Sequence, residues 1–278
     1  MSKQKMIGWL FMVSLLALLI SGCQSAAAES GIPEVTFTAK SLVFDGPKSI
    51  PGGWVRLVLH NEGPDYYHLQ LVKLNEGHHV SDLGAALRES LVPPVWAEMK
   101  GGPNAVDPGR SSSAIVYLEP GDYAIISTVP DRQGVPHVAS GMIRGLTVTE
   151  ATRIVPEPAF DLTLDLVDFS FVLSQPLVAG EQTIRVNNQG SHAHEIWLAK
   201  LGEGKSANDL LMALAPGSPA EAWVYNGLGG LAWIEAGEYG YFSANLEPGR
   251  YALICFVPDH ETGQMHFMLG MVQEFVVE

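Results

Sequence analysis

The sequence predicts an all-β protein made of two tandem β-sandwiches, each with one short inserted helix. This prediction rests on a unit that occurs twice along the chain, on short apolar runs separated by turn residues, and on one helical pattern in each unit. Of the 278 residues, 47% are hydrophobic and 17% are charged, which is a globular composition. A wholly disordered chain is therefore excluded.

The repeated unit is visible as matching motifs at a nearly constant spacing. Asn61-Glu62-Gly63 recurs as Asn188-Gln189-Gly190, and the run Leu118–Ser127 recurs, with few changes, as Leu246–Cys255. The spacing grows by single residues along the chain, as insertions in loops permit. We therefore predict two homologous domains, one at 32–150 and one at 156–278.

Short apolar or β-branched runs bounded by glycine, proline and asparagine predict the strands of each unit. An early strand is expected at Trp54–Leu59 and its counterpart at Thr183–Val186. The near-continuous apolar runs Tyr123–Val129 and Tyr251–Val257 suit strands that are buried on both faces. The last strands of the two units are expected at Met142–Val148 and Met271–Val277.

One helix is expected in each unit. Ser206-x-x-Asp209 resembles a capping box and precedes a leucine-rich segment. In the first unit, the helix is indicated by leucines at i, i+4 spacing, which are Leu83, Leu87 and Leu91. The segment Gly227-x-Gly229-Gly230 is expected to be a loop, without the context of a nucleotide-binding motif.

Residues 1–22 have the features of an export signal. Lys3 and Lys5 precede the apolar run Met6–Ile20, which is shorter than the roughly 20 residues of an ordinary membrane-spanning helix. Ser21-Gly22-Cys23 resembles a bacterial lipobox, which implies cleavage before Cys23 and attachment of a diacylglyceryl group to its sulfur. The alternative is an ordinary secretory signal with an incidental cysteine.

The lipobox resemblance implies where the protein acts. Residues 23–31 would form a flexible tether, because alanine, serine, glutamate and glycine dominate this segment. The lipid would hold the protein on the bacterial cell envelope, at a periplasmic or extracellular face, without spanning the membrane.

The charges and the cysteine count exclude several classes of function. The chain carries 30 acidic and 16 basic side chains, so it lacks the excess of basic groups typical of nucleic-acid binding. Two cysteines can form neither a disulfide-dense scaffold nor a four-cysteine zinc site. With Cys23 lipidated, Cys255 is the only thiol that remains.

Cys255 belongs to an ordered set of candidate metal ligands. It is followed by His266-Phe267-Met268-Leu269-Gly270-Met271, a His-x-x-x-Gly-Met motif, and His194 stands earlier, at the start of a predicted strand. These residues resemble the ligand motif of the cupredoxins, the blue-copper β-sandwich family that includes plastocyanin and azurin. The resemblance implies that each unit is a Greek-key sandwich and that the second one binds a single copper ion.

The same resemblance implies the role of each ligand. His194, Cys255 and His266 would be equatorial ligands and Met271 the axial ligand. A thiolate suits Cu(I) and imidazoles suit both oxidation states, so such a set changes little during electron transfer. The chain would then exchange electrons with a redox protein partner that the sequence does not identify.

The sequence also offers a second pair of candidate ligands. Ten residues separate Cys255 from His266, more than most cupredoxins carry in this loop, and His260 with Met265 would give a tighter spacing. We favour His266 and Met271, because their counterparts in the first unit hold the same place before the last strand, whereas an arginine aligns with His260.

Glu195 follows His194 directly and has two candidate roles. It would accept a hydrogen bond in the outer shell of the metal, or it would supply an oxygen ligand in a less blue, more tetragonal site.

The first unit lacks the complete ligand set. Ser127 aligns with Cys255 and Tyr67 with His194, although His137 and Met142 persist. Without a thiolate no blue site can form, so this unit is expected to be a degenerate copy with a structural or docking role. A weak site that uses His68 and His137 is the alternative.

The sequence thus predicts a membrane-anchored, exported copper-binding protein for electron transfer. An enzyme is not expected, because Ile254 and Phe256 flank Cys255 where multicopper oxidases and copper nitrite reductases of the cupredoxin type carry histidine. Two other functions stay open. One is a metal-free binding or interaction lipoprotein with the same fold, and the other is copper storage or delivery, which the methionines around His266 would serve.

Overall fold

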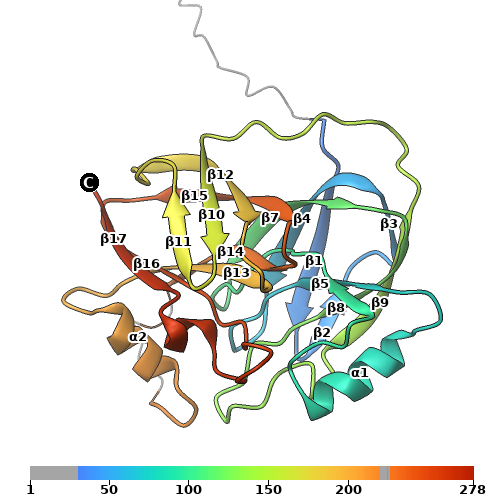
Figure 1. Ribbon diagram of the computed structural model, residues 1–278, viewed down its shortest axis with the longest axis horizontal. Coiled ribbons are helices and arrows are strands. Elements are labelled where there is room, and N and C mark those ends of the chain that lie inside the picture. The colour runs from blue at the N-terminus through green and yellow to red at the C-terminus, as the bar shows by residue number, and fades with distance from the viewer. Residues whose placement is uncertain (1–30, 220–223, 225) are drawn as a thin grey trace, which may run out of the picture.

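The computed structural model of the chain is built mainly from β-strands, with the helices at its periphery (Figure 1). The structure describes residues 31–219, 224 and 226–278, so the predicted leader, the predicted lipidation site Cys23 and all of the predicted tether except Gly31 lie outside the described residues. Within the described part, no helix is long and apolar enough to cross a membrane.

The first half of the chain forms two sets of hydrogen-bonded strands. One set runs in the order β7-β4-β1-β2, with β1 parallel to β4, and the other in the order β3-β9-β8-β5-β6. The bounds are β1 Glu34–Lys40, β2 Val43–Asp45, β3 Ser49–Pro51, β4 Gly53–Asn61, β5 Gln70–Leu74, α1 Val80–Glu89, β6 Ala97–Met99, β7 Ser111–Leu118, β8 Gly121–Ile126 and β9 Ile143–Thr149.

The second half repeats this arrangement. One set of strands runs in the order β11-β10-β12-β15, with β10 parallel to β12, and the other in the order β14-β13-β16-β17. The bounds are β10 Leu162–Val167, β11 Ser170–Leu173, β12 Gly180–Asn188, β13 His194–Lys200, α2 Ala207–Leu214, β14 Gly227–Ile234, β15 Tyr239–Leu246, β16 Gly249–Ile254, the 3₁₀ helix η2 His266–Leu269 and β17 Val272–Val277.

The two halves share one sheet. Strand β15 pairs with β7 through Tyr241 opposite Ile115 and Phe242 opposite Ala114, which joins two four-stranded sets into a sheet of eight strands. Figure 1 shows β7 and β15 side by side in the middle of the molecule. Because β7 and β15 are counterparts in the repeat, the contact has approximate twofold symmetry.

A second symmetric contact joins the two halves along segments that each contain glycines packed closely inside their own half. The segment Lys100–Val106 makes isolated antiparallel bridges to β14, and the N–H of Gly101 donates to the carbonyl of Trp233 at 2.8 Å. A Cβ atom on Gly102 would lie 2.1 Å from the carbonyl oxygen of Leu69, and one on Gly230 would lie 2.1 Å from that of Ile196. Both positions therefore require glycine, and the glycine run Gly227–Gly230, expected to be a loop, forms the first half of strand β14.

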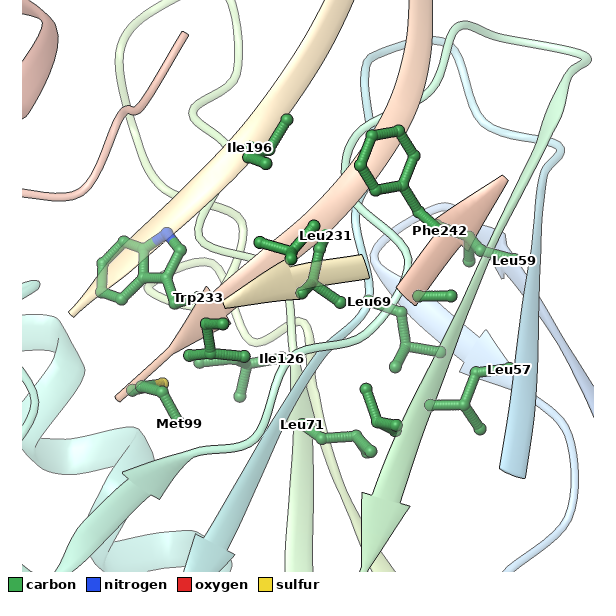
Figure 2. Close-up of a cluster of buried hydrophobic side chains, with 14 of the residues drawn as sticks. Leu57, Leu59, Leu69, Leu71, Met99, Ile126, Ile196, Leu231, Trp233 and Phe242 are labelled. Atoms are coloured by element: carbon green, nitrogen blue, oxygen red, sulfur yellow. The ribbon is translucent and has the colours of Figure 1, made fainter. Parts of the chain in front are cut away.

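The hydrophobic core is continuous across the two halves. Figure 2 shows buried side chains from both, among them Leu57, Leu71 and Met99 from the first half and Ile196 and Phe242 from the second. Separating the halves would expose this apolar surface to water, which is unfavourable at roughly 25 cal/mol per Å².

The predicted all-β fold class is confirmed: the described residues form two repeated sets of strands, each with one short α-helix. Helix α2 begins with the predicted capping box, in which Ser206 and Asp209 bind each other's backbone N–H groups. Several boundaries differ from expectation by a few residues. Helix α1 ends before Leu91, and strands β8 and β16 end at Ile126 and Ile254, so Ser127 and Cys255 are the first residues beyond them.

Replacing Gly230 with alanine should destabilise the protein more than replacing Gly237. Both residues have positive φ, 128° and 82°, but a Cβ on Gly237 would meet no atom within 4 Å. The extra clash at Gly230 should lower the free energy of unfolding by about 2 kcal/mol or more beyond the loss at Gly237. Chemical denaturation of both variants measures this difference, and equal losses would contradict the steric role of Gly230.

Candidate metal centre

The Asn-x-Gly turn sets the position of His194 at the start of β13. The side-chain amide of Asn188 donates to the carbonyls of His192 (2.8 Å) and Ile234 (3.0 Å), and its oxygen accepts from the N–H of Gly190 at 3.1 Å. Asn61 holds the corresponding turn of the first half in the same way. The motif is thus a structural device that fixes where the following strand begins.

Backbone hydrogen bonds draw the loop between Cys255 and Met271 into a compact form. The N–H of Cys255 donates to the carbonyl of Met271 at 3.2 Å, and the N–H of Phe267 donates to the carbonyl of Cys255 at 3.0 Å. The N–H of His266 donates to Val257 and that of Met271 to His266, each at 2.9 Å. These bonds bring the thiol, the imidazole and Met271 together although many residues separate them in sequence.

Three potential ligand atoms converge in the interior. Cys255 Sγ lies 3.5 Å from Nδ1 of His266 and 4.0 Å from Nδ1 of His194, and the two nitrogens lie 3.0 Å apart. All three residues are buried. They form one of the groups of potential metal ligands that the described residues contain.

The donor set fits a single soft or borderline metal ion. Bond lengths of about 2.0–2.1 Å to nitrogen and 2.3 Å to sulfur, typical of zinc, put two ligands of one ion roughly 3.3–3.8 Å apart. Of the three observed separations, 3.5 Å lies within this range, and 3.0 and 4.0 Å lie within about 0.3 Å of its limits. Two imidazoles with one thiolate form the trigonal set of blue-copper sites, so these residues constitute a ligand set for one copper ion.

Asp168 orients the imidazole of His194. Its Oδ1 lies 2.9 Å from His194 Nε2, so Nε2 carries the proton and the lone pair of Nδ1 faces Cys255. Although partial burial opposes ionisation of Asp168, hydrogen bonds from Ser191 and the two histidines hold the pKa of its carboxyl well below the usual value. A Cβ on Gly190 would lie 2.4 Å from Asp168 Oδ1, so this glycine leaves room for the contact.

Burial keeps the potential ligands in defined protonation states. It lowers the pKa of His194, and it lowers that of His266 to about 4 with a contribution from the nearby His194. Both imidazoles are therefore neutral near pH 7, which is the form that binds metals. Burial, together with the charge of Glu195, raises the pKa of the Cys255 thiol, so without a metal this thiol is protonated.

Met271 is fully buried, and its carbonyl accepts the hydrogen bond from Cys255 described above. Gly270, with φ of 111°, ends η2 and turns the chain so that Met271 directly precedes β17. The residue therefore lies beside Cys255.

Glu195 forms hydrogen bonds that hold the chain next to the thiol of Cys255. Its Oε1 accepts the N–H of Phe256 at 3.0 Å, and its Oε2 accepts from Asn104 of the first half at 3.1 Å. The N–H of Glu195 itself donates to Cys255 Sγ at 3.5 Å. Burial raises the pKa of its carboxyl to about 7. The imidazole of His194 forms its hydrogen bond with Asp168 and not with Glu195.

His260 and Met265 lie apart from the three converging atoms. His260 is exposed, with its ring 5.0 Å from that of His192. Met265 is partly buried, forms a β-bridge with Pro258 and lines a different cavity. Among the described residues, the group that contains Cys255 has His266 and not His260 as its second imidazole.

Sequence reasoning missed two residues that support this centre. Asp168 lies in the turn between β10 and β11, and Asn104 lies in the other half of the chain. An isolated aspartate in a turn and an asparagine in a loop carry no motif. Their role depends on tertiary contacts alone.

The corresponding place in the first half is filled by protein atoms. Ser127 Oγ lies 3.3 Å from Nδ1 of His137, and the ring of Tyr67 packs against His137 with 4.6 Å between ring centroids. His68 Nε2 accepts the N–H of Thr128 at 2.9 Å, and burial lowers the pKa of His68 to about 3. In the described part of the chain, neither histidine belongs to a group of three potential metal ligands.

Comparison with known proteins gives structural similarities only. No family model and no curated protein matches the chain. Auracyanin B is 21% identical over 45% of this chain and 93% of its own, with a TM-score of 0.31. Auracyanin A, described as a "blue" copper protein from Chloroflexus aurantiacus, is 22% identical over 42% and 96%, with a TM-score of 0.29. A blue copper oxidase from Nitrosomonas europaea is 15% identical over 88% and 85%, with a TM-score of 0.25.

The Cys255 thiol of the metal-free protein should resist chemical modification until the chain unfolds. The residue is fully buried and burial raises its pKa, so the reactive thiolate is both scarce and inaccessible at pH 8. A chain that begins at Ile32 has Cys255 as its only cysteine, so an aromatic disulfide reagent reports on it alone. Reaction at the unfolded-state rate under native conditions would contradict this.

Replacing Asp168 with asparagine should weaken copper binding about 10- to 100-fold, because the variant loses the carboxylate that fixes the tautomer of His194. Asp165→Asn is the matched control, since that carboxylate lies in the preceding strand and contacts Asn187 instead. Competition with a chelator measures both affinities. Equal affinities in the two variants would mean that Asp168 does not orient the ligand.

Proposed function

We propose that this protein is an exported copper-binding protein that transfers electrons through one mononuclear, type 1-like copper ion in its second half. The ligands would be His194, Cys255 and His266, with Met271 in the axial position. One observation carries the proposal: two buried, neutral imidazoles turn their Nδ1 atoms toward a buried thiol.

Copper, when bound, supplies a one-electron redox couple. The chain contributes a rigid frame for it, because backbone hydrogen bonds and Asp168 hold the donor atoms in place. A frame that is already formed keeps rearrangement small when the oxidation state changes. This rigidity suits an electron carrier.

His266 is the ligand best placed for electron exchange with a partner protein. It lines a cavity of about 460 Å³ together with His192 and His260, and residues Val92–Val95 of the first half line the same cavity. Val95 is 99% exposed, so an apolar side chain stands at the edge of this region. A redox protein that docks there would approach the imidazole of His266.

We also propose that the two halves of the chain have different roles. Residues 32–150 would support the metal-binding half, 156–278, and shape its docking surface, while the lipid on Cys23 would hold the protein at the bacterial cell envelope. The hydrogen bond from Asn104 to Glu195 supports the first part of this proposal. The lipobox-like sequence supports the second.

The proposal is of a carrier and not an enzyme. Ile254 and Phe256 flank Cys255, so no neighbouring histidine links the thiol to a second copper through the backbone. Multicopper oxidases and nitrite reductases of the cupredoxin type depend on such histidines.

A second candidate function is the binding of a small apolar molecule without a metal. A cavity of about 410 Å³ lies between the two halves and is lined by Trp197, Trp233, Phe256 and Phe267. His68, Asn104 and Glu195 supply its buried polar groups. Apolar walls with a few convergent polar groups are typical of small-molecule sites.

Loading with Cu(II) tests the first function. A chain that begins at Ile32 should take up copper at the thiol centre and show strong visible absorption from thiolate-to-copper charge transfer. Cys255→Ser should abolish this band, because serine provides no thiolate. A native chain that takes up copper without the band would refute a type 1-like centre, and one that takes up none would favour the metal-free function.

A matched pair of variants tests which histidine, His266 or His260, is the second equatorial ligand. His266→Ala should bleach the band or lower copper affinity at least tenfold, whereas His260→Ala should leave the band in place. The opposite pattern would assign the equatorial role to His260.

A further inference from the structure

A second cluster of potential metal ligands lies beside the buried centre. His192, Asp259 and His260 offer ligand atoms that all lie within 4.8 Å of one another. Unlike the buried set, this cluster reaches solvent, since His260 is exposed and His192 is partly so. His192 and His260 also line the 460 Å³ cavity that extends to His266.

Contacts within the protein already orient two of the three side chains. His192 Nδ1 lies 3.2 Å from Asp168 Oδ1, which leaves its Nε2 directed toward Asp259. Asp259 Oδ1 accepts hydrogen bonds from the N–H and hydroxyl of Thr262, at 2.8 and 2.6 Å. The other oxygen, Oδ2, is the one that faces His192.

The remaining gap suits a metal ion better than a hydrogen bond. His192 Nε2 and Asp259 Oδ2 are 3.7 Å apart, which is beyond the range of a normal hydrogen bond. Two ligands of one ion with metal–ligand distances of about 2.0–2.2 Å lie roughly 2.8–3.6 Å apart at angles of about 90–110°, so the two side chains need to approach each other by less than about 1 Å to hold one ion. The ring of His260, 5.0 Å from that of His192, needs only a side-chain rotation at the surface to complete the set.

We propose that His192, Asp259 and His260 form a second metal site, which binds a divalent transition-metal ion and prefers Cu(II). Two imidazoles and one carboxylate are nitrogen and oxygen donors, and such sites bind Cu(II) more tightly than the other common divalent ions of the first transition row. No thiol takes part, so this site has ordinary tetragonal copper chemistry and not the blue type.

The two sites share a carboxylate. Asp168 Oδ1 lies 2.9 Å from Nε2 of His194 and 3.2 Å from Nδ1 of His192. An ion on His192 is therefore separated from the buried centre by one carboxylate between two imidazoles. The ion would also lie at the cavity that leads to His266. A metal ion that arrives from solvent would therefore bind at this site first.

The test uses the Cys255→Ser variant of the chain from Ile32 onward, which includes every described strand and helix. This variant has lost the thiolate but keeps the second cluster intact. Titration with Cu(II) should give one bound ion, and its electron paramagnetic resonance spectrum should show tetragonal copper with nitrogen couplings. Adding His260→Ala or Asp259→Asn should weaken this binding at least tenfold.

His78→Ala in the same background is the matched control, because it removes a partly exposed imidazole that stacks on Trp96, away from the cluster. It should leave the affinity unchanged. Copper binding that neither His260→Ala nor Asp259→Asn weakens would place the ion on His194 and His266 and overturn the proposal, as would no binding at all. The proposed electron-transfer function is tested separately, by the thiolate-to-copper absorption band of the chain that keeps Cys255.

Discussion

The hydrogen bonds that close the loop between Cys255 and Met271 are the constraint on which the rest of this centre depends. They bring the thiol of Cys255, which directly follows β16, to 3.5 Å from the imidazole of His266 at the start of η2. His194 joins them because a turn held by Asn188 fixes the start of β13. Burial then keeps the imidazoles neutral and the free thiol protonated.

The first half of the chain takes part in this centre although it lacks the ligands. Its Asn104 donates to Glu195, which in turn accepts the N–H of the residue after Cys255. In its own counterpart site, the ring of Tyr67 and the hydroxyl of Ser127 occupy the positions of His194 and Cys255. A cavity that would otherwise cost packing energy is thus filled. The duplicated unit has kept its fold while only one copy keeps the metal-binding side chains.

The sequence predicted what depends on local pattern and on order along the chain. The repeat, the alternation of turns and apolar runs, and the capping box of α2 are local signals, and the fold class follows from them. The order of His194, Cys255 and His266 indicated which side chains would meet. Asp168 and Asn104 were missed because each acts only through a distant contact. The glycine run of β14 does not form the predicted loop, because Gly230 is required by a close approach between backbones and not by a turn.

The symmetric pairing of β7 with β15 has consequences for how the molecule evolved and for how its halves behave when expressed separately. Pairs such as Ile115 with Tyr241 relate counterpart strands, so the contact has the geometry of an isologous dimer whose two subunits have been fused into one chain. Either half expressed alone would leave the backbone donors and acceptors of this strand uncovered at a sheet edge. The metal-binding half, cut from its neighbour, would therefore tend to rebuild the lost interface by associating with a second copy of itself.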